Sequence, residues 1–356
     1  MAETTGIEWA HSTVNIWEGC TKVSPACKHC YAETNSPVRA METRIGEALQ
    51  VEPSEDGKRR LKMWGVDGFR YETANWEREL RRLNRRERHM REQFGEDHRR
   101  RRIFINSLSD TFEDWQGPVY RLEDGKPVVV AQSLDGVRQR FFRVAEECTE
   151  LDILLLTKRP ENVLGMVPML WAGSNDFART VGKWPSHISI GATVESQEHA
   201  DKRIPELLKV PAKVRFLSVE PLLGPIDFVL VKEEQDTLFG AQTVGANVLA
   251  GRVETRFRDG TTYLDQTVDE RRIHWVIVGG ESGKGARPMH PDWARAIRDQ
   301  CVAAGVPFFF KQWGEWAPSP EIGLPYHFGD GDHAFRVGKR TAGRVLDGRT
   351  WDEVPR

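Results

Sequence analysis

The sequence lacks any apolar run long enough to cross a lipid bilayer. A membrane-spanning helix needs about 20 predominantly apolar residues, and no run of even about 18 occurs in this chain. The first five residues, Met1-Ala2-Glu3-Thr4-Thr5, have neither the basic nor the apolar stretch of an export signal. We therefore expect a cytoplasmic protein with no membrane partner.

Cysteine is scarce, and its five copies cannot all be paired. Secreted domains that depend on disulfides usually have an even number of cysteines and an export signal, so a disulfide framework is not expected. Cys148 and Cys301 lie in stretches with a helical pattern, where a buried, inert thiol is the simplest interpretation. The remaining three cysteines, Cys20, Cys27 and Cys30, fall within eleven residues.

An excess of one charge sign is also missing, since the net charge is only -2. Locally the balance differs: residues 78–102 contain no lysine but 11 arginines against five carboxylates, a net charge of +6. A charged helix is usually a solvated face held by pairs such as Glu87 with Arg91. Arginine concentrated in one segment is also typical of a surface that binds phosphates. Both interpretations remain open from the sequence.

The clustered cysteines follow an alternating apolar run, Thr13-Val14-Asn15-Ile16-Trp17, and are separated by six and then two residues. A C-x-x-C pair binds a metal or forms a redox disulfide, and a third thiol on the same loop favours a metal. A structural zinc ion would need a fourth ligand, for which His29 or His11 is available. An iron–sulfur cluster held by three thiolates would instead leave one iron open to a small molecule.

The loop Gly19-Cys20-Thr21-Lys22-Val23-Ser24-Pro25-Ala26-Cys27-Lys28-His29-Cys30-Tyr31-Ala32 resembles the radical S-adenosylmethionine enzymes. It is most similar to a phage-associated three-cysteine-motif family with the pattern G-C-T-x-x-S-x-x-C-x-x-C-Y-A. The resemblance implies that the three cysteines hold a 4Fe-4S cluster whose free iron chelates S-adenosylmethionine. It further implies an electron donor such as flavodoxin or ferredoxin. The loop departs from the common superfamily pattern in its longer first gap and in having His29 before the last cysteine.

Short apolar runs alternate with helical patterns along most of the chain. Seven runs have the length of buried strands, namely residues 13–17, 103–105, 153–156, 188–190, 214–217, 275–278 and 306–310. Helical patterns lie between them, for example at residues 137–148, 195–208 and 291–304. Alternation of this kind predicts a parallel sheet with right-handed crossovers.

We therefore expect an α/β fold, a partial or near-complete parallel (β/α) barrel of the radical S-adenosylmethionine type. The barrel would span residues 1–317, with a tail at 318–356 packed on it. Insertions are expected at about 50–102, 120–135 and 232–272. The second, around Asp124-Gly125, predicts a hairpin or surface loop, and the third, around Arg258-Asp259-Gly260-Thr261, predicts a larger hairpin.

Each predicted strand ends in polar, charged or glycine residues, and in a barrel these ends meet at one mouth. Position alone predicts these cofactor contacts: Asn106, Ser107, Asp110, Lys158, Thr193, Glu195 and Ser196. It predicts these substrate contacts: Arg159, Glu220, Glu281, Gln312 and Trp313. Taken singly, each could be a helix cap or a surface ion pair. Gly279-Gly280-Glu281 looks like the superfamily's methionine-binding glycine motif, but it follows the sixth strand rather than the second.

The sequence thus predicts an iron–sulfur enzyme that cleaves S-adenosylmethionine to a 5'-deoxyadenosyl radical and abstracts hydrogen from a substrate. The arginine-rich segment and Trp313, as a surface on which bases could stack, suggest a nucleobase or nucleic acid. Two alternatives remain. One is a zinc-binding protein that binds nucleic acid without radical chemistry. The other is a barrel enzyme in which Glu220, Glu281 and Asp110 act as acids and bases.

Overall fold

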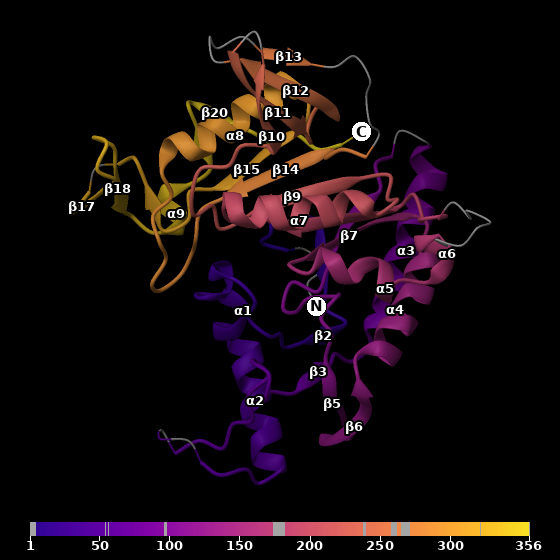
Figure 1. Ribbon diagram of the computed structural model, residues 1–356. Coiled ribbons are helices and arrows are strands. Elements are labelled where there is room, and N and C mark those ends of the chain that lie inside the picture. Colours follow the sequence, from indigo (N-terminus) through magenta and orange to yellow (C-terminus); the bar gives the residue numbers. More distant parts are fainter. Residues whose placement is uncertain are drawn as a thin grey trace. The chain divides into compact units, whose positions relative to one another are not determined.

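The computed structural model (Figure 1) describes residues 5–53, 55, 57–95, 98–173, 182–237, 240–257, 262–264, 271–320 and 322–355. The chain divides into two compact units, residues 1–190 and residues 191–356. Among the helices of the described residues, none has the combination of length and apolar character that crossing a membrane requires.

Seven parallel strands form the main sheet, in the order β1-β4-β7-β8-β9-β14-β15. Their bounds are Ser12–Val14, Arg101–Ile105, Leu151–Thr157, Ile188–Thr193, Arg215–Val219, Trp275–Gly279 and Phe308–Gln312. Each strand matches one of the seven apolar runs, and the spatial order follows the order in sequence. Because β1 and β15 are the two edges, the sheet is open. This confirms a mixed α/β fold with a partial parallel barrel sheet.

The strands are apolar because their residues are buried. All five residues of β9 and all five of β14 are buried, as is usual for strands of a parallel sheet. The predicted helices are present as α4 (Asp135–Glu147), α7 (Gln197–Lys209) and α8 (Pro291–Ala304). Helix α8 has proline at its first position and ends at Gly305 with φ +66°, a left-handed conformation that favours glycine.

The first predicted strand, residues 13–17, is divided in the structure. After β1 the chain leaves the main sheet, and β2 (Trp17–Glu18) joins a second sheet of order β2-β3-β5-β6. The break occurs because the N–H of Ile16 donates to the side chain of Asn106 rather than to a neighbouring strand. The other strands of this sheet are β3 (Arg70–Glu72), β5 (Gln116–Glu123) and β6 (Lys126–Ser133).

The insertion predicted around residues 120–135 is a hairpin. Strands β5 and β6 pair antiparallel, and Asp124 and Gly125 between them both have positive φ, +47° and +80°. Two consecutive residues with positive φ form the tight turn that matches the twist of a hairpin, which explains the Asp-Gly pair.

Several shorter elements complete residues 1–190. After the cysteine loop, the extended residue Asn35 separates two helices, α1 (Tyr31–Thr34) and α2 (Ser36–Ala48). The other helices of this unit are α3 (Trp76–Phe94), α5 (Val163–Met166), α6 (Met169–Ala172) and the 3-10 turns η1 (Pro25–Cys27) and η2 (Pro160–Asn162).

In residues 191–356 a four-stranded antiparallel sheet lies within the predicted third insertion. Its strands are β10 (Val229–Thr237), β11 (Gly240–Asn247), β12 (Arg252–Phe257) and β13 (Thr262–Leu264). The predicted turn at residues 258–261 lies outside the described residues.

The C-terminal segment forms small sheets and runs along β15, where the N–H of Phe310 donates to the carbonyl of Trp351. This pairing covers part of an edge strand that would otherwise expose backbone groups. The elements are β16 (Trp316–Ala317), β17 (Pro325–His327), β18 (His333–Arg336), α9 (Lys339–Ala342), β19 (Val345–Leu346) and β20 (Arg349–Thr350).

Candidate functional site

The beginning of the cysteine loop is fixed by hydrogen bonds on every side. Gly19 has φ +99°, and a Cβ there would lie 2.6 Å from the carbonyl oxygen of Met63, so only glycine fits. The next residues are held through Thr21. Its N–H donates to Glu113 at 2.7 Å, its carbonyl accepts from Arg159 at 2.7 Å, and its hydroxyl accepts from Arg70 at 2.9 Å.

The groups that hold Thr21 form one buried ionic network. Arg70 and Glu113 make a two-pronged ion pair of 2.7 and 2.8 Å, and their side chains are 0% and 2% exposed. Arg159 pairs with Asp110 at 2.9 Å and lies 3.7 Å from Glu113. Two guanidinium groups thus balance two carboxylates, which is the condition for burying charge in a folded protein.

Cys20 lies directly against this network. Its sulfur is 3.8 Å from Nη1 of Arg159, which donates to it. Burial raises the pKa of the Cys20 thiol to about 12, the negative charges of Glu113 and Asp110 add to the increase, and Arg159 opposes it. As a free thiol Cys20 is therefore protonated at neutral pH, whereas a bound metal ion would displace that proton.

The other two cysteines lie in the second part of the loop. Cys27 is buried at the end of η1, with its sulfur 3.9 Å from the hydroxyl of Ser24, and Cys30 is half-buried just before α1. We searched the described residues for three or more His, Cys, Asp or Glu ligand atoms that all lie within 4.8 Å of one another. The only such set lies elsewhere in the chain. At least one distance between the sulfurs of Cys20, Cys27 and Cys30 is therefore longer than 4.8 Å.

Several predicted residues lie at the ends of β4 and β7, and their side chains are hydrogen-bonded to other groups of the protein. Asn106, with φ +60°, accepts from the N–H of Ile16 at 2.7 Å and donates to Thr111 at 3.1 Å. Ser107 donates to the side chain of Asn15 at 3.2 Å.

Asp110 is the most heavily bonded of these residues. Its four donors are the Thr157 hydroxyl, the Phe112 and Lys158 N–H groups and the Arg159 guanidinium, at 2.7 to 3.0 Å. Asp110 thus ties the end of β4 to the end of β7 and orients Arg159 toward Cys20. A carboxylate with four donors is poorly suited to act as a free base.

In residues 191–356, the three predicted contacts after β8 form a local group at the start of α7. Arg203 donates to the carbonyl of Thr193 at 2.8 Å and to the carboxylate of Glu195 at 2.7 Å. Ser196 lies 2.9 Å from Nδ1 of His199, whose other ring nitrogen is 3.5 Å from Glu195. These side-chain partners lie within ten positions in the sequence, and the carbonyl of Glu195 also accepts from the N–H of Leu223 at 2.8 Å.

Glu220 has a partner that sequence reasoning missed. Lys311 pairs with it at 2.9 Å, and the two side chains are only 15% and 13% exposed. Two features make room for the pair. Gly279 has no side chain, and a Cβ there would lie only 2.7 Å from Oε1 of Glu220. In β15 a bulge leaves Lys311 without a paired residue in β14, between the paired residues Phe310 and Gln312. Glycine at the end of one strand beside lysine in the next could have suggested the pair.

The remaining predicted contacts have mainly structural partners. Glu281 accepts from the N–H and from Nε of Arg287, both at 2.8 Å. Gln312 donates to Ser282 at 3.0 Å, and its side-chain oxygen is buried without a hydrogen-bond partner in the described part of the chain. The expectation that Trp313 offers an exposed stacking surface is wrong. Its side chain is buried and donates to the carbonyl of Val345 at 2.8 Å.

The glycine pair after β14 also has a packing explanation. A Cβ on Gly280 would lie 1.9 Å from the carbonyl oxygen of Trp313, and the N–H of Gly280 donates to the carbonyl of Gln312 at 2.9 Å. The pair allows the chain segments after β14 and β15 to touch, which agrees with not assigning it a methionine-binding role.

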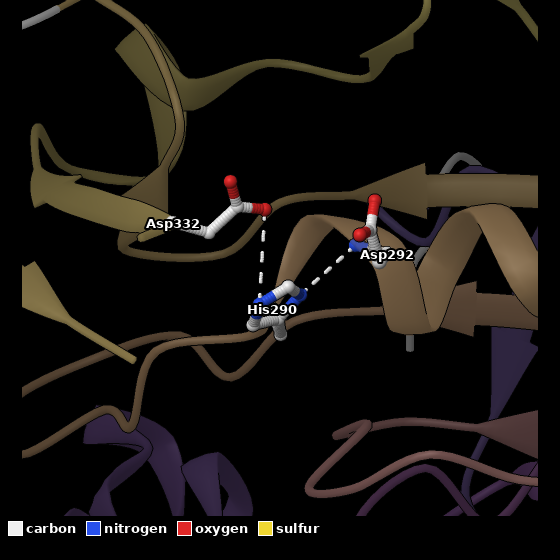
Figure 2. Close-up of side chains that lie close together, drawn as sticks. All are labelled: His290, Asp292 and Asp332. Carbon is white, nitrogen blue, oxygen red and sulfur yellow. Dashed lines mark hydrogen bonds and ion pairs between the residues drawn. The ribbon is translucent and has the colours of Figure 1, made fainter. Parts of the chain in front are cut away.

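Figure 2 shows the group of possible metal ligands that lie closest together, His290, Asp292 and Asp332. Nδ1 of His290 accepts from the N–H of Asp292 at 3.1 Å, so His290 caps the start of α8. Its Nε2 lies 2.9 Å from the carboxylate of Asp330 and 3.7 Å from that of Asp332. A metal-bound histidine normally donates from its second nitrogen. Because that nitrogen accepts here, the group fits a cap better than a metal centre.

Comparison with known proteins adds a family but no activity. No curated protein and no solved structure matches the chain. A family model matches residues 4–355, so the chain belongs to the family described as "Protein of unknown function (DUF5131)".

Proposed function

We propose that the chain is an iron–sulfur enzyme of the radical S-adenosylmethionine type, with Cys20, Cys27 and Cys30 as cluster ligands. The observation that carries the proposal is the buried network that fixes Cys20 and Thr21. Its members come from three separate parts of the chain: Arg70 from β3, Asp110 and Glu113 from the segment after β4, and Arg159 from the end of β7. Such support from surrounding residues is what a metal ligand needs to be held in position before the metal binds.

The donor set fits a cluster better than a single zinc ion. Zinc–sulfur bonds of about 2.3 Å in tetrahedral geometry place sulfurs ~4 Å apart, whereas the three sulfurs here do not all lie within 4.8 Å of one another. Wider spacing suits thiolates that bind different irons of one cluster. His11, a candidate fourth zinc ligand, already accepts from the N–H of Arg102 through Nδ1 at 2.8 Å.

When bound and reduced, a 4Fe-4S cluster of this type would supply the electron that cleaves S-adenosylmethionine to a 5'-deoxyadenosyl radical. The chain's own residues would prepare the site. Arg159 places positive charge and a hydrogen-bond donor on the sulfur of Cys20, which stabilises the thiolate form. Asp110 fixes the direction of that guanidinium, and the Arg70–Glu113 pair keeps the loop from shifting.

The test is anaerobic purification and reconstitution with iron and sulfide, followed by dithionite and S-adenosylmethionine. We expect a brown protein with about four irons per chain that forms 5'-deoxyadenosine. Cys27→Ala should lose both the colour and the product. Cys148→Ala is the matched control, because Cys148 is also buried but lies outside the loop, at the end of α4. It should keep both.

Two results would contradict the proposal. A colourless protein with one zinc ion that Cys27→Ala removes would favour the zinc-binding alternative. Equal iron content in Cys27→Ala and Cys148→Ala would show that the loop is not the ligand set. The reductant, expected to resemble flavodoxin or ferredoxin, can be identified by replacing dithionite in the same assay.

A further inference from the structure

Eight of the 11 arginines of residues 78–102 fall into two groups in the structure. One group is neutralised: Arg81 pairs with Glu77 and Glu147, Arg82 with Glu79, Arg91 with Glu150 and Arg101 with Glu87, all at 2.7 to 3.2 Å. The expected pair of Glu87 with Arg91 is absent, because Glu87 is buried and bonds Arg101 and His98 instead. These pairs fasten α3 to its surroundings.

The second group has no such role. Arg78, Arg85, Arg88 and Arg99 are exposed and form no hydrogen bond or ion pair within the described part of the chain. Arg85 and Arg88 are one helical turn apart, so they repel each other and weaken the helix. The fold does not need them, since α3 is already anchored by its buried face and by the neutralised arginines.

Arg78 and Arg85 stand on one stripe of α3. Seven residues correspond to two helical turns, so their Cα atoms are about 10 Å apart along the axis. Arg82, partly exposed, lies between them, and the exposed His89 continues the same face one turn on. The opposite face is buried through Trp76, Leu80 and Leu83. The result is a straight, basic edge on the outside of residues 1–190.

We propose that the exposed arginines of α3, Arg78 and Arg85 on this stripe together with the adjacent Arg88 (the arginine stripe below), bind the phosphate backbone of a nucleic acid. Guanidinium groups spaced along one side of a helix match successive phosphates of a strand, and the planar guanidinium can bind each phosphate through two hydrogen bonds. A membrane surface is a poorer match, because a membrane-binding helix must expose its apolar face, and the apolar side chains of α3 from Trp76 to Leu83 are buried. The proposal deepens the proposed function by naming the substrate class, a base carried on a polynucleotide.

The experiment measures binding of a fluorescein-labelled DNA duplex and of the corresponding single strand by anisotropy over a series of salt concentrations. The variant R78Q/R85Q/R88Q is compared with R39Q/R336Q/R340Q, which removes three exposed arginines from other parts of the surface. We expect the stripe variant to bind more weakly. The slope of its plot of log affinity against log salt concentration should be smaller in magnitude by about two to three, because each arginine removed loses one phosphate contact. The control variant should bind as the unchanged protein does.

Equal loss in both triple variants, or an unchanged slope in the stripe variant, would overturn the proposal. So would stripe-dependent sedimentation with phosphatidylserine vesicles in the absence of DNA binding. Binding needs no cofactor, so Cys27→Ala should bind DNA normally. If DNA binding survives while no cluster forms, the stripe is supported and the radical chemistry fails. If a cluster forms and 5'-deoxyadenosine appears without DNA binding, the reverse holds.

Discussion

The strands of residues 1–190 and those of residues 191–356 both end in polar and charged residues, but the side chains at these ends have different partners. In the first unit, Arg159 reaches Cys20 and Thr21, which lie 139 and 138 positions earlier in the chain. In the second unit, Glu195 bonds Arg203 eight positions later, and Glu281 bonds Arg287 six positions later. Short-range bonds of this kind are what caps and turns make. Convergence of distant segments on one loop is what distinguishes the cysteine site.

The first prediction compares the loss of one buried carboxylate in each unit. Both losses should lower stability, but only the loss in residues 1–190 should also lower iron binding. Glu113→Ala leaves Arg70 charged and buried, so the free energy of unfolding should fall by about 3–5 kcal/mol, measured by urea denaturation. Glu195→Ala does the same to Arg203 and should cost a similar amount. Only Glu113→Ala should also reduce iron binding after reconstitution. Equal iron loss in both variants would remove the distinction between the units.

Much of the fold could be predicted because buried parallel strands appear in the sequence as short apolar runs. All seven runs became strands of the main sheet, and Pro291 to Ala304 became α8 with the predicted bounds. The break after Val14 could not be predicted, since it depends on a bond from Ile16 to Asn106, 90 positions away. Local pattern contains no information about such a partner.

The candidate site was predictable in part for the same reason. Cysteine spacing identified the loop, and position at strand ends brought Asp110 and Arg159 into the set. The bonds from Arg159 to the loop were not predicted, and its expected contact with a substrate stays a prediction. Arg70 and Glu113 were missed altogether, since a single charged residue away from the predicted strand ends gives no sign that it will be buried. Trp313 was misjudged because tryptophan in a Gly-containing loop resembles an exposed aromatic.

The second prediction concerns Arg159, which joins the ionic network to the cluster ligand. Arg159→Gln removes the donor to Cys20 and leaves the Thr21 carbonyl without its partner, so unfolding should become easier by about 1–3 kcal/mol. Reconstituted protein should bind less iron, and its cluster should be harder to reduce in a potentiometric titration, since positive charge near the sulfur is lost. Arg159→Lys keeps the charge and should recover part of the potential. Normal iron content and potential in Arg159→Gln would limit its role to packing.

The third prediction examines the exception in the second unit, the pair of Glu220 with Lys311. Lys311→Met leaves the largely buried carboxylate of Glu220 with the hydroxyl of Ser218, 3.4 Å away, as its remaining side-chain donor among the described residues. We expect a loss of about 1–2 kcal/mol, between the values for exposed and fully buried pairs. Lys311→Arg should lose less. If Lys311→Met keeps its stability but no longer forms 5'-deoxyadenosine, the pair of Glu220 with Lys311 has a functional role. The difference proposed between the two units would then be wrong.

The smallest expected effect lies at the edge of the first unit, where His11 Nδ1 accepts from the N–H of Arg102. Desolvation of the ring, together with the positive charges of Arg102 and Arg101, lowers the pKa of His11 from 6.5 to about 4. Between these two values the unfolded chain binds a proton that the folded protein does not. The stability from this contact is therefore complete above pH 6.5 and is lost as the pH falls toward 4. His11→Asn keeps an acceptor that cannot titrate, so its melting temperature should fall less steeply than that of the unchanged protein over this range. Identical slopes would mean that the pKa of His11 is the same in the folded and the unfolded chain, so that this ring does not make the stability depend on pH.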